Sequence, residues 1–150
     1  MERKRERKPE TEMIPYAEIK RFTLELIDRH SVAGETVSPA YNNQSDYIGR
    51  IPNLINAALT QIALTVSPAR EPPPGRLPVG AADAYELDAP YPWAQCACYY
   101  AAAYLVMDDS EFAYAALMNE YEAFLRRLSG RISAEFADIR EAYAFPTGGG

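Results

Sequence analysis

The chain has 150 residues, of which 48% are hydrophobic and 24% are charged, a composition typical of one folded domain with a core of its own. The formal net charge of −6 excludes a protein that grips nucleic acid over its whole surface, because phosphates repel an acidic body. No apolar run approaches the roughly 20 residues of a membrane span, and no signal-peptide core follows the charged first residues, so we expect an intracellular chain that does not enter a membrane.

The charge is distributed unevenly, with a basic segment at the start of the chain. Residues 1–10 contain five basic and three acidic side chains, so they carry +2 and the remainder carries −8. We predict that residues 1–12 form a disordered basic N-terminus. Two interpretations stay open: a solvated, frayed terminus, or contact with nucleic acid or an acidic partner. The second would use Arg3, Lys4, Arg5, Arg7 and Lys8.

Two amphipathic helices are predicted in the first half of the chain. Apolar residues recur every three or four positions between Tyr16 and His30, which is the pattern of one buried helix face. Residues 35–45 have the composition of a loop. Pro52 lacks a backbone donor and should interrupt a helix, so the second helix is expected to begin at Pro52 and to end near Val66.

A proline-rich stretch, residues 67–92, follows these helices. Its prolines exclude a helix in the first part, whereas Val79 and residues 85–87 have the composition of short strands that would pair as a small hairpin. A connection of this length inside a domain is usually functional. We interpret it either as an arm that contacts another protein or as a tolerated surface loop.

A helical hairpin is the best-specified part of the sequence. Residues 92–107 and 111–128 each carry apolar side chains at helical spacing, and only a short acidic break separates them. Asp108 is expected to cap the second helix, with Glu111 completing a capping box three residues later. Gly130 is expected to end this helix.

Together these elements predict an all-α fold, a small bundle of about four helices with a long proline-rich central loop. Residues 13–130 would form this helical domain. Residues 131–150 would form an extended and partly flexible C-terminal arm, in which only a weak helix over residues 133–143 is expected.

The sequence offers little for catalysis or metal binding. Cys96 and Cys98 diverge by about 200° on a helix, so they are interpreted as small core residues rather than as a disulfide or a metal pair. The single histidine, His30, suits a helix C-terminus, and the acids at 108, 109 and 111 suit helix capping. No phosphate loop, HExxH, GxSxG or CxxC motif occurs. We expect no enzymatic activity, metal or cofactor, with a small enzyme of unrecognised type as the least favoured alternative.

Eleven tyrosines are the positive signal, because tyrosine combines a large apolar body with a polar tip and is enriched where proteins meet. Those of the hairpin point in several directions, so they form either a two-helix core with exposed rims or a core plus a subunit interface. We expect contacts from the hairpin, the proline-rich stretch and the arm, at Tyr99, Tyr114, Tyr121, Pro73, Leu77, Val79, Tyr85, Phe136, Tyr143 and Phe145.

Two regions of the chain resemble the head–tail connector, or adaptor, proteins of tailed bacteriophages. The first comprises Leu26–Arg29, Tyr41–Tyr47 and Arg50–Ala58, and the second comprises Ala101–Leu105, the acidic turn and Tyr121–Leu125. Together they span about two thirds of the chain. The basic N-terminus and the proline-rich stretch match no pattern of that family.

The resemblance implies a structural protein of the virion neck that is present in the host cytoplasm during assembly. Members of the family form rings, commonly of twelve subunits, with one surface on the portal protein and another toward a tail or neck protein. An isolated subunit can stay monomeric until it meets the portal. DNA passes through the lumen without sequence-specific binding, which suits an acidic body. The alternative is a DNA-associated packaging or regulatory helical protein that uses the basic N-terminus.

Overall fold

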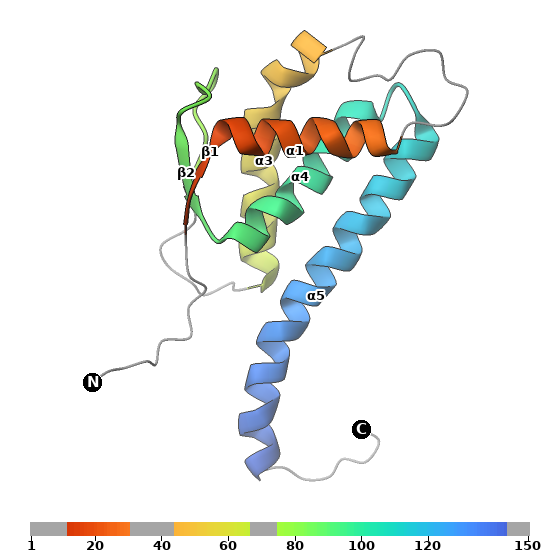
Figure 1. Ribbon diagram of the computed structural model, residues 1–150. Helices are drawn as coiled ribbons and strands as arrows, with labels where there is room; N and C mark the ends of the chain where they lie inside the picture. Colours follow the sequence, from red (N-terminus) through yellow and green to blue (C-terminus); the bar gives the residue numbers. More distant parts are fainter. Residues whose placement is uncertain (1–11, 31–43, 67–74, 144–150) are drawn as a thin grey trace.

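The computed structural model describes residues 12–30, 44–66 and 75–143 as a mainly helical fold, in which four helices pack against one another beside a small two-stranded sheet. This arrangement matches the predicted helical bundle, and the sheet is an addition to it. The elements in chain order are β1 (Glu12–Pro15), α1 (Tyr16–Arg29), α3 (Gln44–Val66), β2 (Glu86–Ala89), α4 (Tyr91–Val106) and α5 (Glu111–Tyr143) (Figure 1).

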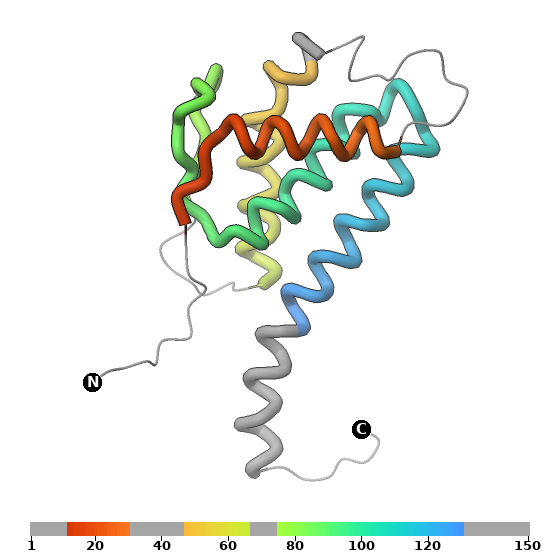
Figure 2. The backbone as a smooth tube through the Cα atoms, in the orientation of Figure 1, coloured from red at the N-terminus to blue at the C-terminus, as the bar shows by residue number. Residues whose placement is uncertain are grey.

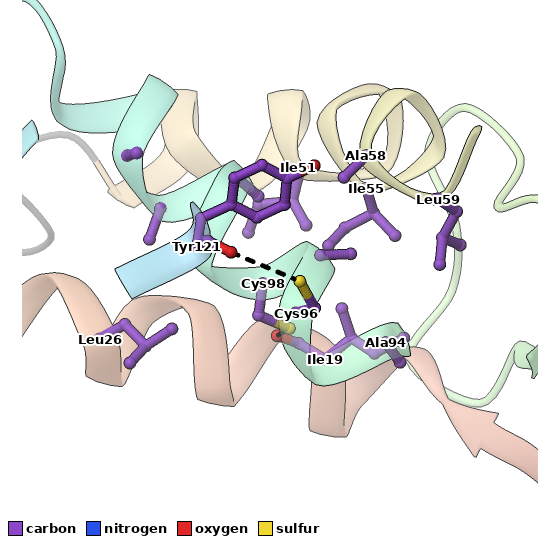
Figure 3. Close-up of a cluster of buried hydrophobic side chains, with 14 of the residues drawn as sticks. Ile19, Leu26, Ile51, Ile55, Ala58, Leu59, Ala94, Cys96, Cys98 and Tyr121 are labelled. Atoms are coloured by element: carbon purple, nitrogen blue, oxygen red, sulfur yellow. Dashed lines mark hydrogen bonds between the residues drawn. The ribbon is translucent and has the colours of Figure 1, made fainter. Parts of the chain in front are cut away.

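Helix α4 is the centre of the fold and packs against α1, α3 and α5; Figure 2 shows α1 crossing it. Most of its residues are buried, including Cys96, Ala97, Ala101 and Ala102. A helix that is apolar on every side belongs in the interior. Its small side chains let three helices approach closely, and Ile55 and Leu59 of α3 fill the space beside it (Figure 3).

Helix α1 confirms the predicted amphipathic element. Ile19, Leu26 and Ile27 are buried on the side that faces α4. On the opposite side, Arg21 Nη1 lies 3.1 Å from Glu25 Oε2, an exposed pair four residues apart that contributes a few tenths of a kcal/mol, about 0.3–0.5. The hydrophobic periodicity was sufficient to predict α1, because its buried side chains face α4 along the length of the helix.

The two strands pair antiparallel over long sequence separation. Ile14 lies opposite Leu87, and both side chains are buried, whereas Met13 faces outward. The predicted hairpin between Val79 and residues 85–87 is therefore wrong, since β2 pairs with β1 instead. A strand of four residues leaves no periodic signal that would identify a partner more than 70 residues away.

Helix α3 continues through Pro52 and begins at Gln44, so the predicted break at this proline is wrong. Proline removes the N–H that would bind the carbonyl of Ile48, four residues earlier. The Tyr16 hydroxyl of α1 donates to that carbonyl oxygen at 3.4 Å. A long-range partner thus replaces the missing helical donor, and the helix ends at Val66 as predicted.

Helix α5 differs from the prediction at both ends. Its cap is Ser110, not Asp108: the Ala113 N–H donates to Ser110 Oγ at 3.1 Å. Gly130 does not end the helix, which runs to Tyr143, so residues 131–143 are helical rather than extended. Gly130 lacks the left-handed conformation that terminates helices; among the described residues only Gly80 has a positive φ. Of the N-terminus predicted to be disordered, residues 1–12, the structure describes only Glu12, which belongs to β1. Residues 1–11 and the end of the arm, residues 144–150, lie outside the described residues.

Candidate functional site

Residues 75–85 of the proline-rich stretch are fastened to the bundle by a buried asparagine of α3. Asn56 Nδ2 donates to the Leu77 carbonyl oxygen at 2.9 Å, and the Leu77 N–H donates to Asn56 Oδ1 at 2.8 Å. Both polar ends of the buried amide are thereby satisfied. The Gly75 N–H adds a hydrogen bond of 2.8 Å to the Asp88 carbonyl on the outer edge of β2. This end of the stretch is held in place and is not a swinging arm.

The same segment caps the N-terminus of α1. Pro15 supplies no side-chain acceptor at this position. The Tyr16 N–H donates instead to the Tyr85 carbonyl at 2.7 Å, and the Ala17 N–H donates to the Asp83 carbonyl at 3.1 Å. Lys20 Nζ also lies 2.6 Å from Asp83 Oδ1. These contacts fasten the second end of the segment.

Between the two anchors the segment presents an apolar tip, Pro78–Gly80. Val79 is 86% exposed, and Gly80 turns the backbone with φ of +69°, a conformation that other residues rarely adopt. Tyr85 is 42% exposed, and its hydroxyl donates to the Arg76 carbonyl at 3.4 Å. Because the backbone of this loop is already ordered, little conformational entropy is lost when a partner binds to the tip, which favours binding.

Four tyrosines of the hairpin form one cluster between α4 and α5. The ring centroids of Tyr100 and Tyr104 lie 4.7 Å apart, those of Tyr100 and Tyr121 5.2 Å, and those of Tyr104 and Tyr114 5.8 Å. The Tyr121 hydroxyl donates to the side-chain oxygen of Gln61 on α3. Tyr121 is buried, and the other three rings are half-buried, so this cluster belongs mainly to the hairpin's own packing.

A second group of rings, the aromatic strip, comprises Phe22, Tyr99 and Phe124. Tyr99 lies between the other two, with centroid distances of 5.9 Å to Phe22 and 6.0 Å to Phe124. The Arg127 guanidinium lies 5.1 Å from the centre of the Phe124 ring. All three rings are half-buried. The strip joins α1, α4 and α5 on a partly exposed face.

A pocket of about 50 Å3, the outer pocket, adjoins the strip where α1 passes over α4. Its polar lining consists of Glu18, Arg21 and Gln95, and the Tyr91 hydroxyl donates to Glu18 Oε2 at 3.2 Å. Burial, together with this hydrogen bond, raises the pKa of the Tyr91 hydroxyl. The pocket's apolar walls come from Ile14, Ile19, Phe22, Tyr91, Ala94 and Cys98. The pocket therefore combines mostly apolar walls with one acidic and one basic side chain.

The two cysteines are free and buried, as predicted. Cys96 Sγ donates to the Tyr121 carbonyl at 3.9 Å (Figure 3), and Cys98 Sγ donates to the Ile19 carbonyl at 3.7 Å. Burial raises the pKa of each thiol to about 12. Thiols that stay protonated at neutral pH are poor nucleophiles and poor metal ligands.

The single histidine joins the end of α1 to α5. His30 Nδ1 lies 3.0 Å from the Leu26 carbonyl oxygen, and Nε2 lies 3.1 Å from Glu120 Oε2. Both ring nitrogens of His30 therefore have contacts within the chain itself. The described residues contain no group of three or more histidine, cysteine or acidic side chains arranged to hold a metal ion.

The predicted interface residues have different environments. Leu77 and Tyr121 are buried in the chain's own core and do not offer a contact surface. Val79 and Tyr85 are exposed, whereas Tyr99 and Tyr114 are half-buried. Phe136 and Tyr143 belong to α5, whose described side chains end at residue 130, and Pro73 and Phe145 lie outside the described residues.

Sequence reasoning missed two apolar residues at the turn between α4 and α5. Phe112, one of the apolar residues in the helix predicted over residues 111–128, is 66% exposed, and Met107 is 41% exposed. The buried positions Ala113, Leu117 and Tyr121 recur every four residues. This spacing leaves Phe112 about 100° away from the stripe, so a stricter reading of the period would have found it.

No protein-family model, curated protein or solved structure matches this chain. Within the described residues, none of the helices combines the length and the apolarity needed to cross a bilayer.

Proposed function

We propose that the chain is a structural phage protein, a head–tail connector that forms a ring between the portal of the capsid and the tail. The observation that carries this proposal is the resemblance described above, and its residues belong to the elements that build the core. Arg50–Ala58 lies in α3, and Ala101–Leu105 and Tyr121–Leu125 lie in α4 and α5. A small helical domain with an anchored apolar loop tip suits assembly.

Two exposed regions are available for the two kinds of contact that a ring subunit needs. One is the tip of residues 78–80, with Tyr85 nearby, and the other is the turn that bears Met107 and Phe112. Hydrophobic side chains held out by rigid elements are typical contact residues. We assign these regions to the neighbouring subunits and to the portal or tail protein.

The ring would take up DNA in its lumen without gripping it. The chain outside residues 1–10 carries −8, and a surface of this sign repels phosphates and lets a duplex slide. Assembly would occur in the host cytoplasm, and the finished ring, of twelve subunits in the family that the chain resembles, would reside in the virion neck. The free subunit would be monomeric.

The deciding experiment mixes the purified chain with the portal protein encoded in the same genome. Mass photometry and negative-stain electron microscopy should show portal rings that gain one further ring of density and a whole number of copies of this chain. Val79→Asp, a change on the exposed tip, should leave the monomer folded and reduce the occupancy. Portals that keep their original mass at saturating concentrations of the chain would contradict the proposal.

The second candidate is a DNA-associated packaging or regulatory protein, and the observation that favours it is the charge of +2 confined to residues 1–10. Retention of a duplex at low salt, lost on removal of residues 1–8 and falling steeply as salt rises, would support it. A matched variant with Glu2, Glu6 and Glu10 changed to glutamine should bind more tightly. Absence of retention by either chain would remove this candidate.

A further inference from the structure

Among the described residues, the most exposed large apolar side chain and the outer pocket are complementary features of the same molecule. Val79 is 86% exposed at the tip of a loop that Asn56 and Lys20 hold at its two ends. The outer pocket measures about 50 Å3 and has mostly apolar walls. This is roughly three to five times the space that one water needs, so the pocket admits a branched aliphatic side chain.

The loop that bears the tip is fastened to α1 on the side turned away from the centre of the pocket. Lys20, which fastens the loop through Asp83, is two positions away from both Glu18 and Phe22, which line the pocket. Two positions correspond to about 200° around a helix. A protrusion on one side and a matching recess on the other form the two halves of a head-to-tail contact between copies.

Charge supports the same pairing. Arg76 is exposed three residues before Val79, with its backbone carbonyl bound by the Tyr85 hydroxyl. At the outer pocket, Arg21 lies 3.1 Å from Glu25, and Glu18 accepts the Tyr91 hydroxyl, so Glu18, Arg21 and Glu25 together carry a formal charge of −1. A valine that enters the pocket therefore brings a cation toward this net negative charge.

We propose that the Val79 tip of one copy of this chain inserts into the outer pocket of the next copy. The contact is heterologous, and repeated contacts of this kind close into a ring when the rotation between copies allows it. The inference rests on the proposed connector function. It deepens that function by naming the surfaces through which neighbouring ring subunits meet. The partner is a second copy of the full chain.

Disulfide trapping tests the contact directly. A full-length chain that carries Val79→Cys together with Gln95→Cys is oxidised at high concentration, both alone and bound to portal. Native Cys96 and Cys98 stay silent because they are buried. We expect a ladder of covalent dimers and higher oligomers on a non-reducing gel. The matched control replaces the first change with Leu64→Cys, since Leu64 is 64% exposed on α3 and does not line the pocket.

The contact is supported if the Val79→Cys pair gives a ladder several-fold stronger than that of the control. A further Ala94→Leu change, which fills the pocket, should reduce this ladder. No ladder under either condition, or equal ladders from both pairs, overturns the proposed contact. The outcome of this test can be distinguished from that of the portal experiment. Portal binding without the ladder leaves the connector proposal standing, and a ladder without portal binding leaves the contact between copies standing. A cross-link confined within single chains assigns the pocket to the chain's own loop and also overturns the inference.

Discussion

The Tyr16 hydroxyl of α1 donates a hydrogen bond of 3.4 Å to the carbonyl oxygen of Ile48 in α3. That carbonyl is the one that Pro52 leaves without its helical donor. Tyr16 is buried, and burial together with the nearby Asp83 carboxylate raises the pKa of its hydroxyl to about 12. One side chain therefore completes a neighbouring helix and ties α1 to α3 at the point where the proline would otherwise weaken the fold.

This relationship predicts a coupling between two substitutions. Tyr16→Phe should lower the free energy of unfolding by about 1 kcal/mol, because the partly buried Ile48 carbonyl loses its donor. In a Pro52→Ala background the same change should have a smaller effect, since the alanine amide binds the Ile48 carbonyl. Urea unfolding of the two single variants and the double variant gives the coupling energy. Tyr85→Phe, which removes an exposed hydroxyl contact, is the control, and equal effects of Tyr16→Phe in both backgrounds would contradict the coupling.

The paired hydrogen bonds between Asn56 and Leu77 predict that the asparagine side chain governs the order of the loop. Asn56→Asp keeps an acceptor for the Leu77 N–H but loses the donor to the Leu77 carbonyl and buries a charge. We expect a loss of about 2 kcal/mol in the free energy of unfolding and faster hydrogen exchange at the Leu77 amide. Asn53→Asp, an exposed change on the same helix, should alter neither quantity. Unchanged exchange at Leu77 in the Asn56 variant would show that other contacts hold the loop.

Alkaline pH should destabilise the fold through groups that are buried in their protonated form. Burial raises the pKa of Cys96 and Cys98 from 9.0 to about 12 and that of Tyr16 from 10.0 to about 12. The folded chain then holds more protons than the unfolded chain, so the stability that these groups contribute is complete below pH 9 and declines between about pH 9 and 12.

Urea unfolding in a reducing buffer at pH 8, 9, 10 and 11 measures this decline. A Cys96→Ala, Cys98→Ala chain should be less stable at pH 8, because small cavities form, but its free energy of unfolding should fall less steeply as pH rises. A variant with the native slope would show that the thiols do not contribute to it. The remaining slope should then come from Tyr16 and from Tyr121, whose pKa burial also raises.

The observed cap of α5 predicts unequal effects of two neighbouring substitutions. Ser110→Ala removes the acceptor for the Ala113 N–H and should lower the free energy of unfolding by about 1 kcal/mol. Asp108→Ala should have little effect, because Asp108 is exposed and does not accept this bond. Thermal unfolding followed by circular dichroism distinguishes the two. The reverse order would restore the Asp108 cap that the sequence indicated.

Local sequence was enough to predict α1, α4 and the start of α5. Helix α1 repeats its apolar positions against one surface, whereas α4 is a long run of apolar residues that is buried on most sides. Local sequence failed where a distant residue decides the local structure. Pro52 is accommodated by Tyr16, and β1 acquires its identity only by pairing with β2. The same limit applies to the candidate site. The sequence indicated Val79 as a contact residue, and the structure shows that it is exposed. The hydrogen bonds from Asn56 that hold the loop could not be predicted, because one polar residue on a helix does not reveal a distant partner.

The C-terminal arm is expected to serve assembly rather than folding. Leu128 is the last buried residue among the described side chains of α5, which end at residue 130, and Tyr99 of α4 and Phe124 of α5 pack against each other. Removal of residues 131–150 should therefore leave the melting temperature within a few degrees of the native value while portal binding is lost. Removal of 144–150 alone, which keeps all of α5, is the control. If the chain that ends at residue 130 stays folded and docks on portal as well as the full chain does, the assignment of this arm to assembly is wrong.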